Sequence, residues 1–167
     1  NVHEWKRFSI GDAKRALIVE VEDMDNDGDM DVLFSDNDVV GWYDNPGPHG
    51  VQKQWPLHVL ARGLKPRMLA LCDLDQDGMR DVVTTANKQD DPSVVGVWIR
   101  RGSADGGSWE SHPIAIESGL PYGGDSENMS YSKAVECADF NLDGRMDLVF
   151  VARGKGVGAY WLSYQGD

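Results

Sequence analysis

Basic residues are scarce in this sequence, and acidic residues outnumber them. The 167 residues include 16 lysines and arginines against 28 aspartates and glutamates, which gives a formal net charge of −12 at pH 7. Nucleic acids and anionic membrane surfaces are bound through basic patches, so we expect neither as a partner. The sequence also lacks an apolar run of about 18 residues, which argues against membrane insertion.

Cysteine is almost absent as well, because the chain holds only Cys72 and Cys137. Two cysteines are too few for the disulfide framework of a small secreted domain. Each lies one or two residues before an acidic stretch, in a segment that reads as a strand. Buried reduced thiols are the favoured interpretation, since free cysteine behaves as a small core residue. A bridge between the two is the alternative.

The common catalytic signatures are missing too. The sequence has no G-x-S-x-G, H-E-x-x-H or phosphate-binding glycine pattern. His58 and His112 stand at the same place in a repeated W-x-x-H pattern, which favours a structural role. We therefore do not expect this chain to be an enzyme.

What the sequence does contain is a repeat. A tryptophan precedes an acidic loop by 18 residues at Trp5 and again at Trp55, and by 30 residues at Trp109. The third unit therefore carries an insertion, which we place at residues 119–131. Each unit reads as four short strands rich in valine, isoleucine, tryptophan and threonine, and no segment shows a sustained helical period. Repeated four-stranded antiparallel units predict an all-β chain of propeller blades.

The third predicted blade is incomplete. The blade units cover residues 11–60, 61–116 and 117–167, with residues 4–10 as an additional strand. The third unit lacks the W-x-x-H strand that ends the others, and EWKRFSI at 4–10 aligns with QWPLHVL and SWESHPI. We therefore predict that the N-terminal strand completes the last blade, either from another copy of the chain or within a larger propeller. Three blades are too few for a ring, so we expect a homo-oligomer or further blades. Two chains would give six blades, and a rotation that does not close would give a filament.

Three acidic loops recur in register: DMDNDGDMD at 23–31, DLDQDGMRD at 73–81 and DFNLDGRMD at 139–147. Oxygen donors at positions 1, 3 and 5 converge on one point, glycine at position 6 permits a sharp turn, a carbonyl at position 7 adds a ligand, and aspartate at position 9 closes the cage. Hard oxygen ligands in a flexible loop suit calcium, with magnesium the second choice. The loops hold no histidine or cysteine, which argues against zinc and copper. An EF-hand is excluded because position 12 is Phe34, Thr84 or Phe150 rather than glutamate, and the flanks read as strands.

These loops, once per blade and flanked by strands, resemble the calcium loops of FG-GAP or VCBS-type repeats in integrin-α-like β-propellers. GWYDNPGP at 41–48 is similar to a W-[YF]-x-N-P-G segment common in secreted bacterial propellers. The resemblance implies one calcium ion per repeat, about three in all. It implies side-chain ligands at Asp23, Asp25, Asp27, Asp31, Asp73, Asp75, Asp77, Asp81, Asp139, Asn141, Asp143 and Asp147, and carbonyl ligands at Asp29, Met79 and Arg145. With Asn141 in place of a carboxylate, we expect the third site to be the weakest.

Calcium sites of extracellular modules bind at roughly 10⁻⁴ to 10⁻³ M, so we expect a secreted or cell-surface protein that calcium stabilises. The predicted function is adhesion, assembly or scaffolding, including self-assembly by strand donation, with an extracellular protein or glycan as partner. The alternative is a glycan-binding module or the propeller part of a secreted carbohydrate-active enzyme, such as a polysaccharide lyase or sugar dehydratase. Long loops on rigid scaffolds often bind ligands. The insertion therefore offers a candidate surface, with its residues Tyr122, Asp125, Glu127 and Tyr131.

Overall fold

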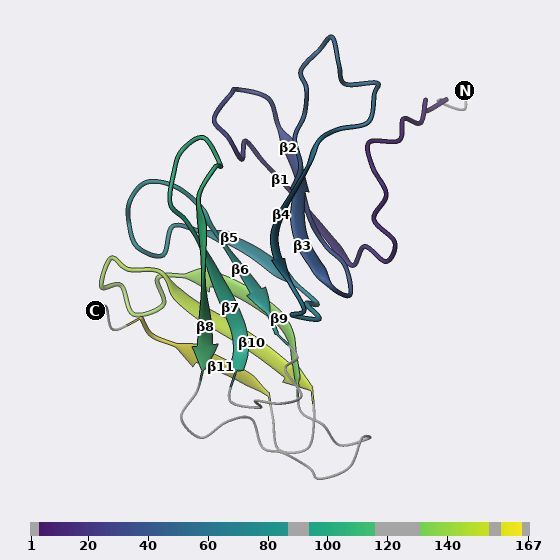
Figure 1. Ribbon diagram of the computed structural model, residues 1–167. Helices are drawn as coiled ribbons and strands as arrows, with labels where there is room; N and C mark the ends of the chain where they lie inside the picture. The colour runs from purple at the N-terminus through teal and green to yellow at the C-terminus, as the bar shows by residue number, and fades with distance from the viewer. Residues whose placement is uncertain (1–3, 87–93, 116–130, 154–157, 165–167) are drawn as a thin grey trace.

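The chain forms three antiparallel sheets that pack against one another in sequence order (Figure 1). The computed structural model describes residues 4–86, 94–115, 131–153 and 158–164. Within these residues every regular element is a strand, so the all-β prediction is confirmed. No helix there is long and apolar enough to cross a membrane.

In the part of the chain that the structure describes, two sheets have four strands and the third has three. The first sheet has the order β1 (Ile18–Glu22), β2 (Asp31–Ser35), β3 (Val39–Tyr43) and β4 (Leu57–Arg62). The second has the order β5 (Leu69–Cys72), β6 (Asp81–Thr85), β7 (Val94–Arg101) and β8 (Trp109–Ala115). The third contains β9 (Tyr131–Ala138), β10 (Asp147–Arg153) and β11 (Ala159–Leu162). Consecutive strands pair within each sheet, as expected for blades joined by hairpins.

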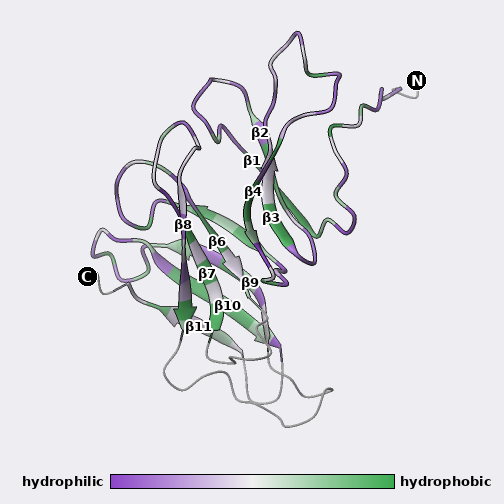
Figure 2. Ribbon diagram, viewed as in Figure 1, coloured by the Kyte–Doolittle hydropathy of each residue, from purple (hydrophilic) through white to green (hydrophobic). Residues whose placement is uncertain are grey.

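The second sheet is the centre of the molecule because both of its faces are covered. Its strand β6, DVVTT, is buried at every residue, while β1 alternates between exposed and half-buried residues. One apolar cluster, including Leu33, Trp42 and Ile99, lies between the first and second sheets. Another, including Val83 and Phe150, lies between the second and third. Figure 2 shows the hydrophobic residues gathered on the strands, so the core consists of the two layers between sheets.

Cys72 and Cys137 form a disulfide, so the prediction of reduced thiols was wrong. Cys72 ends β5 and Cys137 lies near the end of β9, with their Cα atoms 6.4 Å apart. Both strands are the first of their sheets, and stacking one sheet on the next brings these two ends together. The pairing depends on this stacking rather than on any local pattern in the sequence.

The histidines of the W-x-x-H pattern occupy equivalent places. His58 on β4 stacks on Trp42 with ring centroids 4.3 Å apart, and His112 on β8 packs on Trp98 at 5.2 Å. Residues 4–10 form no strand within the single chain, and Trp5 there is 93% exposed. Their pairing with another chain stays a prediction. Tyr122, Asp125 and Glu127 of the insertion lie outside the described residues.

Candidate metal centres

Each acidic loop connects the first two strands of its sheet, and the three loops share one backbone conformation. Position 4 has a positive φ in all three, with values of 60° at Asn26, 62° at Gln76 and 61° at Leu142. The glycine at position 6 also has a positive φ, between 86° and 95°. Residues with a Cβ rarely adopt such angles, so the glycine is required by the turn. The repeated D-x-[DN]-x-D-G pattern therefore encodes one repeated loop.

Hydrogen bonds to the aspartates curl each loop inward. The carboxylate at position 1 accepts a bond from the glycine N–H at position 6, at 3.0 Å for Asp23, 3.0 Å for Asp73 and 2.8 Å for Asp139. The carboxylate at position 5 accepts a bond of 2.8 Å from the N–H at position 7 in every loop. The side chains at positions 1, 3 and 5 are thereby turned toward a common point.

In the first two loops this convergence is close. Carboxylate oxygens of Asp23, Asp25 and Asp27 lie within 4.8 Å of one another, and those of Asp73, Asp75 and Asp77 do the same. Such oxygen-only groups could hold a hard divalent cation. Burial raises the pKa of Asp25 above its ordinary value, and its neighbour Asp27 raises it further. Crowded carboxylates of this kind repel one another unless a cation or a proton compensates them.

The aspartate at position 9 has a different environment from the other carboxylates. Asp31, Asp81 and Asp147 are at most 1% exposed. One oxygen of each accepts a bond from the N–H at position 2, at 2.8, 3.2 and 3.1 Å. The other oxygen accepts one from a backbone N–H at or just after the end of the third strand, at 2.7, 2.8 and 3.3 Å. These aspartates join the loop to the third strand of the sheet, and their role as metal ligands stays a prediction.

Burial raises the pKa of two of these carboxylates, whereas at Asp147 burial is outweighed by hydrogen bonds, including those from the N–H groups of Phe140 and Tyr164, and the pKa is lowered. Burial raises the pKa of Asp31 from 3.8 to about 6, against the opposing effect of the hydrogen bonds from the N–H groups of Asn45 and Met24. Burial also raises the pKa of Asp81. Low-dielectric surroundings disfavour the ionised form, so charge on Asp31 and Asp81 opposes folding unless a positive group lies nearby.

The second loop differs from the first in its contact with Arg100. The Nε of Arg100 donates to Asp75, and its terminal nitrogen lies 4.0 Å from Asp77. The Oδ1 of Asp73 is buried and has no hydrogen-bond partner among the described residues. An unpaired buried carboxylate oxygen is unfavourable, and a bound cation would satisfy it. The donor set therefore fits a metal ion, although Arg100 already supplies one positive charge.

Sequence reasoning missed the third-strand residues that lie beside the loops. Arg100 stands two residues after Trp98, and Asp44 stands at the same place after Trp42 in the first sheet. Asp44 raises the pKa of Asp25 and Asp31, in each case as a smaller effect than burial. Both residues follow a tryptophan at the same spacing, so the sequence already contained this signal.

The third loop is the most open. Its residues 140–146 are all exposed, whereas positions 2 and 3 are buried or half-buried in the other two loops. Asn141 donates a bond of 2.8 Å from its amide to Asp143, so the amide nitrogen rather than an oxygen faces that carboxylate. Gln76 of the second loop donates to the carbonyl of Gly144 and joins the two loops. The carbonyl ligands predicted at Asp29, Met79 and Arg145 stay predictions.

Comparison with protein families supports the repeat. A family model for the FG-GAP-like repeat matches residues 23–84 and again 73–150. The chain belongs to the FG-GAP-like repeat family. Both matches begin at an acidic loop, and together they include all three loops. The comparisons with curated proteins and with solved structures returned no significant match. The family membership and the three blade-like sheets confirm the predicted resemblance and fold class.

Proposed function

We propose that this FG-GAP-like chain is an extracellular β-propeller module that calcium stabilises, and that it serves adhesion, assembly or scaffolding. The observation that carries the proposal is the threefold recurrence of one loop, with carboxylates at positions 1, 3 and 5 converging within 4.8 Å in two of the copies. One such cluster is common on protein surfaces. Three loops with the same backbone at the same place in consecutive sheets indicate a shared ligand.

Calcium would act here on folding. Positions 1, 3 and 5 would hold the ion, and its charge would replace the repulsion between carboxylates. A ligand that binds only the folded state stabilises it by about 2.7 kcal/mol per site at a hundred times its dissociation constant. The disulfide between Cys72 and Cys137 supports an oxidising compartment, where calcium is also abundant.

Thermal unfolding with and without calcium tests the proposal. We expect millimolar calcium to raise the melting temperature by many degrees over EDTA, and magnesium to do so less. The variant Asp25→Asn should lose part of this increase, whereas Asp29→Asn should keep it, because only the carbonyl of Asp29 is a predicted ligand. A melting temperature indifferent to EDTA, or equal losses in both variants, would contradict the proposal.

A second candidate function is glycan binding, alone or as part of a secreted carbohydrate-active enzyme. An open groove of about 580 Å³ between the second and third sheets is lined by Trp98, Trp161 and Tyr164 among other residues. Aromatic rings and hydroxyl groups in such a groove suit sugar stacking. Screening against a glycan array, followed by turnover assays on any hit, separates this candidate from the first.

A further inference from the structure

Among the described residues, exposed large apolar side chains are confined to the N-terminal segment, the first blade unit and the third blade unit. Among the described residues, every exposed large hydrophobic side chain lies within residues 5–59 or 140–161, and none lies between them. Val19 and Val21 on β1 are 58% and 56% exposed, and Trp161 on β11 is 53% exposed. The same positions in the second sheet are covered by neighbouring sheets. Exposed apolar patches of this kind mark interaction surfaces.

The groove between the second and third sheets lies at the edge of the incomplete sheet. It is lined by Leu74, Trp98, Ile114, Leu148 and Leu162, besides Tyr164, which stands two residues after the end of β11. Strand β11 pairs with β10 alone among the described residues. The groove therefore adjoins the edge where the other two sheets have a fourth strand.

The corresponding space between the first and second sheets is filled by Trp109. Several residues that line the groove have equivalents one sheet earlier, at the same loop position or strand register. Leu74 and Trp98 of the second sheet correspond to Met24 and Trp42 of the first. Leu148 and Leu162 of the third sheet correspond to Val82 and Ile99 of the second. Trp109, at the start of β8, packs against the apolar cluster that contains Met24, Trp42, Val82 and Ile99. A tryptophan on a fourth strand of the third sheet would enter the groove in the same way.

Residues 4–10 carry the side chains that this position requires. In the second sheet Trp109 pairs with Arg101 and His112 pairs with Trp98. Trp5 and Phe8 have the same spacing as Trp109 and His112. In the same register, Trp5 would pair with Tyr164, and Phe8 would lie over Trp161. Phe8 would then take the place on Trp161 that His58 takes on Trp42 in the first sheet.

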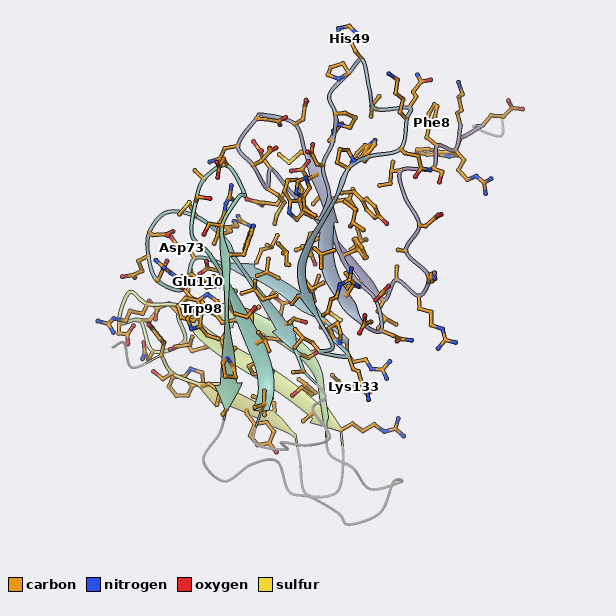
Figure 3. The ribbon with its side chains drawn as sticks, in the orientation of Figure 1. Phe8, His49, Asp73, Trp98, Glu110 and Lys133 are labelled. Atoms are coloured by element: carbon orange, nitrogen blue, oxygen red, sulfur yellow. A yellow bond between two sulfur atoms is a disulfide. The ribbon has the colours of Figure 1, made fainter. Side chains whose placement is uncertain are left out.

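These residues cannot reach β11 of their own chain. The N–H of Trp55 donates a bond of 2.8 Å to the carbonyl of Ile10, which holds the end of the segment beside the first sheet. Figure 1 shows the N-terminus and β11 on opposite sides of the molecule. Figure 3 likewise places Phe8 far from Trp98. For residues 4–10 to pair with β11, they must therefore belong to a second chain.

We infer that residues 4–10 of a second copy form the fourth strand of the third sheet, with Trp5 in the groove and Phe8 on Trp161. Reciprocal exchange joins two chains into a dimer of six complete sheets and covers both apolar outer faces. The inference rests on the proposed function, because it names the partner in assembly. It assigns the aromatic groove to a strand of this protein rather than to a glycan.

Sedimentation velocity of the whole chain in saturating calcium tests the inference. We expect a species of twice the 18.5 kDa chain mass, or a series of larger assemblies if the rotation does not close. The double variant Trp5→Ala/Phe8→Ala should sediment as a monomer. Both side chains are exposed in the single chain, so its calcium-dependent melting should persist. Glu110→Ala, an exposed residue on β8, is the control and should assemble normally.

Mixing variants identifies the contact itself. Trp161→Ala damages the accepting edge and leaves the donated strand intact. Mixed with Trp5→Ala/Phe8→Ala, it should give a heterodimer with one intact junction, whereas each variant alone should sediment as a monomer. A monomeric wild-type chain, or assembly that survives both variants, would overturn strand exchange. A monomer whose melting still depends on calcium leaves the calcium proposal standing. A calcium-independent dimer would instead overturn calcium stabilisation alone, and glycan binding by monomeric wild-type chain would assign the groove to sugars.

Discussion

The first two acidic loops have the same backbone and the same pattern of burial, yet they face different third-strand neighbours. Both have positive φ at positions 4 and 6, and both bring three carboxylates within 4.8 Å. The first loop has the carboxylate of Asp44 nearby, which raises the pKa of Asp25. The second has the guanidinium of Arg100, which contacts Asp75. Two loops of one motif therefore differ by two units of charge in their surroundings.

This difference shows that a loop motif does not by itself set the affinity of a cation site. The ligands come from the loop, but the field at the site also comes from the third strand, which packs beside it in the sheet. Arg100 acts as a counter-ion for the second loop, whereas Asp44, the third-strand neighbour of the first loop, is negative and raises the pKa of Asp25. We expect the first loop to depend more strongly on a bound cation.

The largest expected effect comes from removing one carboxylate at position 5. In saturating calcium, Asp27→Asn should destabilise the protein by about 2 to 3 kcal/mol, the stabilisation that one well-occupied site provides. Asp77→Asn should have a smaller effect, because Arg100 still compensates Asp75. Chemical unfolding of both variants measures the difference. Equal losses would show that Arg100 does not replace a cation.

Exchanging the third-strand neighbour should change affinity next. Arg100→Ser introduces the residue that stands at this position in the third sheet, and it should tighten calcium binding at the second loop by about tenfold. Asp44→Ser should weaken binding at the first loop, because an attractive charge is lost. To isolate each site, the aspartate at position 5 of the other two loops is changed to asparagine. Titration calorimetry then measures the calcium affinity of the remaining loop. If Arg100→Ser and Asp44→Ser do not change the calcium affinities of their loops in opposite directions, the predicted effect of the third-strand neighbour is contradicted.

Removing calcium should reverse the effect of Arg100→Ser, from tighter calcium binding to a lower melting temperature. In EDTA it should melt a few degrees below the wild type, since Asp75 and Asp77 lose their positive neighbour. In calcium it should melt at least as high as the wild type. Differential scanning calorimetry in EDTA and in calcium measures the melting temperatures of the variant and the wild type. Arg62→Ser, which removes an exposed ion pair to Asp38 away from the loops, should change neither value appreciably.

The smallest expected effect is a pH dependence at the first loop. The pKa of Asp31 is 3.8 unfolded and about 6 folded, so the folded state holds the proton more tightly. Without calcium, stability should therefore be greatest in acid and fall as the pH rises through about 6. The loss between pH 5 and 7 should be on the order of 1 kcal/mol. Asp31→Asn should flatten this profile in EDTA and Asp29→Asn should not. A wild-type profile that rises toward neutral pH would contradict the assignment.

Much of the loop geometry could be predicted because it is local. Aspartates at positions 1, 3 and 5 and glycine at position 6 define a turn within nine residues, so a pattern in the sequence describes it fully. The W-x-x-H pattern is local as well, and its histidines take equivalent places on β4 and β8. The disulfide could not be predicted in this way, because Cys72 and Cys137 are 65 residues apart and meet only when two sheets stack. Arg100 was missed because a loop motif does not include the residue that packs beside it.

The sequence by itself determined the repeated unit. This unit consists of strands with alternating or continuous apolar residues, loops with convergent carboxylates, and tryptophans at equivalent positions of each repeat. These features depend on neighbours within a few residues or across one hairpin. Only the tertiary structure decided which copy of a feature is covered and which is open. Trp42 and Trp161 hold the same position in their sheets, but one is 1% exposed and the other 53%. The reason is packing: Trp42 has a neighbouring sheet and a fourth strand beside it, and Trp161 has neither among the described residues.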